Sequence, residues 1–179
     1  MIIYGGKDMA GSFRTVRRNT IQIANDIPED GYGFRATPET RSVAEELAHI
    51  ATATLWVPQA HEVDRTTFIS FEDFGGYMTR IAEVAQTLTS KTDIINALTK
   101  NGEEFAGFLE RMTDDQLSEQ VGFPPPIQPS TKTRFEMLLG TKEHELHHRA
   151  KLMVLERLLG IVPHLTRARE QMQPAAAKQ

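Results

Sequence analysis

Cysteine is absent from the 179-residue sequence. Its absence excludes a disulfide framework, thiolate metal ligands and a cysteine nucleophile. Any metal ion must therefore be held by histidine or carboxylate side chains, and any thiol chemistry must use a thiol from the substrate. The sequence also lacks an apolar run near the roughly 20 residues of a membrane helix, and its start, MIIYGGKDMAG, does not resemble a signal peptide. A cytoplasmic protein without a membrane partner is expected.

An excess of positive charge is missing as well. The formal net charge is -4 and the pI is near 5.9, which argues against a general electrostatic affinity for nucleic acid. Hydrophobic residues make up 40% and charged residues 25%, the composition of an ordinary soluble globular protein. We expect one domain over residues 1–165. Residues 166–179 are expected to form a frayed tail, because they have little to bury.

Apolar residues recur at helical spacing nearly throughout, and neither a repeat nor a convincing strand is visible. PPPIQP, residues 124–129, predicts a loop or extended crossing because proline cannot continue a helix. The pattern predicts an all-α bundle with one proline-rich connection. The expected helices span 8–26, a segment with Thr37 as N-cap that ends at Pro58, 71–88, a segment opened by a Ser90–Asp93 capping box, and Thr133 to about Gly160.

Three of the six histidines lie in EHELHHR, residues 143–149. His144 and His148 are four residues apart, so on a helix they share a face with Cβ atoms about 5–6 Å apart. The same stripe continues through Leu152 and Leu155, which directs the pair toward the core. Two buried neutral imidazoles leave polar atoms that need partners. A metal site is therefore favoured over a pair of hydrogen-bonded histidines at the edge of the core.

The remaining histidines are less clearly placed by their neighbours. His49, in EELAHIA on a separate predicted helix, could reach the His144–His148 pair in an antiparallel or crossed bundle. We expect His147 at the surface or behind the ligands, and His61 and His164 in solvent beside loop or proline signals.

The motif H-E-x-x-H is present as His144, Glu145 and His148. In a zinc protease the two histidines bind the ion and the glutamate is the general base. The extended motif requires glycine and a third histidine where this chain has Lys151 and Val154. No edge strand is expected that could bind an extended peptide. A protease is therefore disfavoured.

ELAHIA, the proline loop and EHELHHRAKLMVLERLLGI together resemble the DinB/YfiT family of small bacterial metal-binding proteins over residues 10–165. The resemblance implies a four-helix bundle, here with an extra short helix and the proline-rich connection before the last helix, and commonly a homodimer. It also implies His49, His144 and His148 as ligands of a divalent transition metal, zinc or nickel, with open positions. The chain departs from the family pattern after the last histidine, with Ala150 and Lys151 in place of Gly-Gln.

The resemblance further implies a metal-dependent enzyme that acts on a small-molecule substrate. Its type is a transferase that uses a low-molecular-weight thiol as co-substrate, or a hydrolase, and the sequence indicates no catalytic residue besides the ligands. The alternative is a non-catalytic metal-binding or interaction module whose ion only joins two helices. An open pocket beside the histidines would favour the enzyme, whereas a fourth protein ligand would favour the structural ion.

Overall fold

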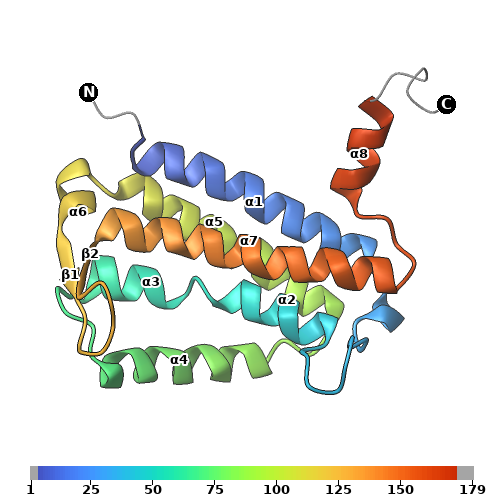
Figure 1. Ribbon diagram of the computed structural model, residues 1–179, viewed down its shortest axis with the longest axis horizontal. Helices are drawn as coiled ribbons and strands as arrows, with labels where there is room; N and C mark the ends of the chain where they lie inside the picture. The colour runs from blue at the N-terminus through green and yellow to red at the C-terminus, as the bar shows by residue number, and fades with distance from the viewer. Residues whose placement is uncertain (1–3, 173–179) are drawn as a thin grey trace.

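The structure is a computed structural model that describes residues 4–172. Its elements form a helical bundle, which confirms the predicted all-α fold with a proline-rich connection (Figure 1). Helices α1 and α5 lie against each other, α7 lies beside α1, and α2 contacts α5, α7 and α4. The main helices are α1 (Gly6–Asp26), α2 (Val43–Thr52), α4 (Phe71–Gln86), α5 (Lys91–Arg111) and α7 (Arg134–Leu158).

Two of the predicted helix starts are confirmed at the atomic level. The Ser90 side chain accepts a hydrogen bond from the Asp93 amide at the start of α5, and Thr133 does the same for Glu136 at the start of α7. In both cases the acidic side chain accepts a hydrogen bond from the backbone amide of the capping residue. Each box satisfies two amide groups that the first turn of a helix would otherwise leave unpaired.

The predicted start of α2 at Thr37 and Pro38 is wrong. The helix begins at Val43, with Ser42 as its N-cap and Glu45 as the reciprocal partner. Thr37 instead accepts the backbone amide and the hydroxyl of Thr40 in a turn. The capping box at Ser42 satisfies two backbone amides, those of Ser42 and Glu45. A proline at the first helical position satisfies none, so Pro38 is the weaker start signal.

The predicted helix that ends at Pro58 is divided into pieces. After α2 come a turn, the short α3 (Trp56–Pro58) and a π-helical turn, η2 (Gln59–Val63). The Thr52 hydroxyl bonds back to the Ala48 carbonyl, and Pro58 has no amide hydrogen to donate. The break directs Trp56 toward α4, where its ring lies 5.8 Å from Phe74 and 5.7 Å from Tyr77.

A two-stranded hairpin was not predicted. Strands β1 (Gln120–Gly122) and β2 (Thr131–Thr133) pair antiparallel on either side of the proline loop, after the short helix α6 (Asp114–Ser118). Three residues are too few for an alternating pattern to be recognised in the sequence. The proline loop itself is non-helical, as predicted. The hairpin carries this loop to the end of the bundle where α4 begins (Figure 1).

The core consists of two apolar clusters. One contains Leu152 and Leu155 of α7 together with residues of α1, α2 and α5, and the other surrounds Phe13 and Phe105. After α7 the chain turns at Gly160, whose positive φ of 78° suits glycine. Across residues 4–172 no helix has both the length and the apolar character that a membrane crossing requires.

The predicted frayed tail is partly helical. Helix α8 (His164–Met172) has no buried residue, but Arg167 binds Asp26 of α1 with an N–O distance of 2.6 Å. Residues 173–179 lie outside the part of the chain that the structure describes.

Candidate metal centre

The structure brings His49, His144 and His148 together between α2 and α7. The Nε2 atom of His49 lies 3.1 Å from that of His144 and 3.2 Å from that of His148. The Nε2 atoms of His144 and His148 are 3.1 Å apart. The i,i+4 spacing on α7 and the contact of α2 with α7 thus converge three nitrogen atoms on one point.

This nitrogen triangle fits a metal ion better than it fits hydrogen bonds alone. Three imidazole ligands at about 2.0–2.1 Å from a tetrahedral ion would have nitrogen atoms roughly 3.3 Å apart. His148 donates its Nδ1 hydrogen to Glu46 at 2.6 Å, which leaves a lone pair on its Nε2. Each Nε2 atom carries either a hydrogen or a lone pair, so three such atoms cannot all pair with one another, whereas one cation could accept a lone pair from each.

The electrostatic setting keeps two of the candidate ligands, His49 and His144, neutral. Burial, assisted by the nearby Arg41 and the other histidines, lowers the pKa of His49 to about 4. Burial, assisted by the nearby His148, His147 and Arg41, likewise lowers the pKa of His144 to about 4. Both imidazoles are therefore deprotonated at neutral pH and able to bind a metal ion.

Glu46 orients the buried ligand and was missed in the sequence. Its side chain is 3% exposed, and it lies three residues before His49, on the same face of α2. Although burial opposes ionisation, the hydrogen bond from His148 and the charges of Lys151 and Arg41 hold the pKa of Glu46 below its usual value. A carboxylate behind a metal-binding imidazole fixes the tautomer and increases ligand basicity.

Lys151, which departs from the family pattern, belongs to this charged group. Its Nζ lies 3.9 Å from Glu46 Oε1, while Arg41 Nη1 lies 3.4 Å from Oε2. The departure thus adds a cation near the carboxylate that holds His148.

Glu145 lies on the other side of α7. It is 2% exposed and accepts hydrogen bonds from Arg17 at 2.9–3.1 Å and from Thr20 at 2.7 Å. An i,i+4 pair of Glu145 with Arg149 is the local expectation for a helix surface, but Arg17 of α1 is the partner found. This carboxylate is turned away from the histidines, so the general base of the protease motif is not in place.

The prediction of solvated His61 and His164 is wrong. His61 is 3% exposed and accepts a hydrogen bond at 2.8 Å from the buried Arg134. Burial and the Arg134 charge lower the pKa of His61 to about 4. His164 is partly buried and its Nε2 lies 3.4 Å from Asn19 Oδ1. His147 is exposed, in agreement with the predicted surface position.

A pocket of about 320 Å³ opens beside His49 and His144. The point where the three Nε2 atoms converge is thus accessible to a small molecule from one side. Its other lining residues are Ala53, Trp56, Phe74, Met78, Phe123, Lys132, Glu136, Met137, Gly140 and Thr141.

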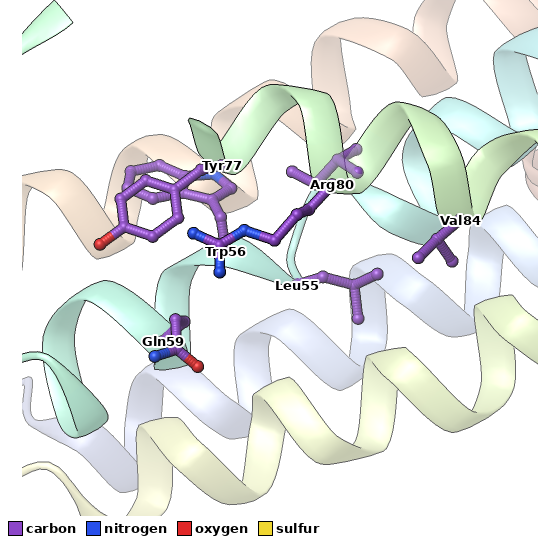
Figure 2. Close-up of a pocket in the computed structure, with 7 residues that line it drawn as sticks. Leu55, Trp56, Gln59, Tyr77, Arg80 and Val84 are labelled. Atoms are coloured by element: carbon purple, nitrogen blue, oxygen red, sulfur yellow. The ribbon is translucent and has the colours of Figure 1, made fainter. Parts of the chain in front are cut away.

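Two further pockets are separate from this opening. A pocket of about 640 Å³ is lined by Arg41, Lys151 and Glu46 among others, behind His148. A smaller one, about 150 Å³, lies between α3 and α4 and holds none of the histidines among its lining residues. Figure 2 shows Trp56 and Tyr77 close together in the smaller pocket, with Arg80 beside them.

Comparison with known proteins agrees with this fold. A family model described as the DinB superfamily matches residues 12–152. The chain belongs to the DinB superfamily.

A related protein and its crystal structure support the DinB assignment. The uncharacterized protein YjoA of Bacillus subtilis (strain 168) is 26% identical over 149 residues, which cover 83% of this chain and 86% of YjoA. The crystal structure of a DinB-like protein, YjoA of Bacillus subtilis, matches with a TM-score of 0.60 and 23% identity over 85% of this chain and 92% of that one. The match shows the DinB-like fold, in which this chain has a three-histidine cluster that could bind a metal ion.

Proposed function

We propose that this DinB protein is a metal-dependent enzyme that acts on a small molecule at His49, His144 and His148. The observation that carries the proposal is the convergence of three Nε2 atoms within 3.1–3.2 Å beside an open pocket. The group of candidate ligands found among residues 4–172 holds these three side chains and no fourth. Three protein ligands with an open position are typical of catalytic rather than structural zinc sites.

A divalent zinc or nickel ion, when bound there, would supply a Lewis acid that acidifies a coordinated thiol or water. The chain contributes the remaining functions through its own side chains. His148 is held in one tautomer by Glu46, and the pocket beside His49 and His144 admits the substrate. Because the chain has no cysteine, the thiol of a transferase reaction would come from a low-molecular-weight co-substrate. A hydrolase would use water in the same position.

The rival function is a structural ion without catalysis. It is favoured by the position of the cluster, because one ion would join α2 to α7. A structural ion would contribute much of the folding free energy. A catalytic ion could be removed from a bundle that stays folded, since both apolar clusters pack independently of it.

Metal content tests the ligand assignment. Untagged protein should carry about one divalent transition metal per chain, and His148→Ala should lose it. His147→Ala, the adjacent exposed histidine, is the matched control and should retain the ion. Elemental analysis with circular dichroism measures occupancy and folding together. Equal metal in the His148→Ala and His147→Ala proteins would contradict the assignment.

Cobalt substitution tests the open position. A low-molecular-weight thiol should add an intense sulfur-to-cobalt charge-transfer band, because sulfur ligates the ion directly. His49→Ala should abolish the band and leave the helical signal. If several thiols leave the cobalt spectrum unchanged, the thiol-transferase form is rejected and hydrolysis or the structural ion takes its place.

A homodimer is a further part of the proposal, and it rests on the family resemblance. Large apolar side chains are exposed at the end of α7 and beyond it, which a twofold interface could cover. They are Val154, Leu158, Val162 and Leu165. Light scattering at tens of micromolar should give twice the monomer mass.

A further inference from the structure

The pocket beside the histidines continues into a second cavity. The two share five lining residues, and the second cavity has a volume of about 430 Å³. It runs past the start of α4 to Ile127 in the proline loop. Together they form one groove that leads from His49 and His144 to the hairpin end of the bundle. The shared residues are Trp56, Phe74, Phe123, Lys132 and Met137.

The walls of this groove are apolar along most of its length. Three large apolar side chains that line the second cavity remain exposed: Phe71 at 58%, Phe74 at 44% and Ile127 at 36%. Contiguous exposed apolar surface of this kind marks a ligand or partner site. Away from the histidines, the charged lining residues are Lys132 and Glu136. Their opposite charges offset each other, so the groove favours an uncharged apolar group.

Gly140 determines the width of the groove beside His144. It lies inside α7, one turn before His144, and lines the pocket. Glycine inside a helix costs about 0.5–1 kcal/mol relative to alanine. A Cβ atom at Gly140 would meet nothing within 4 Å, so packing within the chain does not require glycine. Its small size keeps the path beside His144 wide.

We infer that this groove binds the apolar body of the substrate, while the polar head of the same molecule reaches the three histidines. The substrate class is an elongated small molecule with a metal-coordinating head and an uncharged aliphatic or aromatic body. The assignment of the polar head to the histidines rests on the proposed function, whereas the assignment of the apolar site depends only on the groove. Both cavities have the size of ordinary small-molecule pockets.

Trp56 provides a direct signal for the apolar site. It is the single tryptophan of the chain and lines both cavities. Its fluorescence should change when butyrate, hexanoate and octanoate bind to the metal-free protein. Affinity should rise about three- to fourfold per added methylene group, as full apolar burial predicts.

Substitution of Gly140 localises the binding. Gly140→Leu fills the groove beside His144 and should weaken octanoate binding at least tenfold, whereas Gly140→Ala should change it less than twofold. Circular dichroism should show that both variants fold. Affinity that does not depend on chain length, or equal binding by the two variants, would overturn the inference. So would a fall in mass by light scattering when octanoate binds, because the groove would then be an interface between two copies.

The link to the histidines has its own measurement. In the zinc-loaded protein, hexanethiol should bind at least tenfold more tightly than hexanol, and His148→Ala should remove that difference but retain octanoate binding. Equal binding of thiol and alcohol to protein shown to contain zinc would overturn the link between groove and ion. If the purified protein binds no zinc but binds octanoate, the proposed function fails while the apolar site stands.

Discussion

His144 and Glu145 are neighbours on α7, but they belong to opposite kinds of polar cluster. His144 faces α2 and a pocket, and its Nε2 is close to two other ring nitrogens that cannot all be satisfied by one another. Glu145 faces α1 in the closed interior, where Arg17 and Thr20 satisfy it. Arg17 in turn donates to the Leu98 carbonyl at 2.9 Å.

This difference indicates that the polar cluster around Glu145 is structural, whereas the cluster around His144 is functional. The Arg17–Glu145 cluster is charge-balanced and complete, so it ties α1, α5 and α7 together without any ligand. The histidine cluster is electron-rich and open on one side, which is expected of a site that binds a cation and a substrate.

The largest effect should come from breaking the closed cluster. Glu145→Ala leaves the Arg17 charge buried at 4% exposure without its partner, and should lower the free energy of unfolding by about 3–5 kcal/mol. His144→Ala in metal-free protein should cost about 1 kcal/mol or less, because its side is open to solvent. Urea denaturation of both variants measures the contrast. Similar losses would contradict the division into two kinds of cluster.

A smaller effect should follow from loosening the open cluster. Glu46→Gln keeps an oxygen that can accept the His148 Nδ1 hydrogen but removes the charge at 2.6 Å. Zinc affinity should fall about 10- to 100-fold, as for other residues behind metal ligands. Competition with a fluorescent chelator measures it. Glu45→Gln, at an exposed neighbour, is the control and should leave the affinity unchanged.

The smallest effect concerns a further glutamate, Glu156 of α7. Glu156 is fully buried, and neither carboxylate oxygen has a hydrogen-bond partner among the described residues. Burial and the charge of Asp26 raise its pKa to about 7. Because the folded state then holds the proton more tightly than the unfolded state, the wild-type protein should lose stability as pH rises from about 4.5 to 7.

Glu156→Gln removes this loss. It should be more stable than the wild type by about 1–2 kcal/mol at pH 8, with little difference at pH 4.5. Thermal unfolding at both pH values, with exposed Glu143→Gln as control, measures the change. An equal gain at both pH values would show that ionisation is not the cause.

Local patterns in the sequence were sufficient for most of the long helices and for two of the three histidines. Capping boxes at Ser90 and Thr133 were correct because each is completed within four residues. The His144–His148 pair follows from helical spacing alone. His49 needed the family resemblance, since no local pattern says which face of α2 meets α7.

The tertiary structure decided the hydrogen-bond partners of the buried polar side chains. Whether Glu145 pairs within its helix or with Arg17, and whether His61 lies in solvent or against Arg134, depends on residues 128 and 73 positions away. Glu46 behind His148 and the groove toward Ile127 likewise arise only when separate elements meet. The sequence by itself determined where the long helices lie and which residue types could bind a metal, because those depend on short-range spacing. Packing decided which polar groups are satisfied and which remain open, because hydrogen bonding and burial depend on contacts between distant segments.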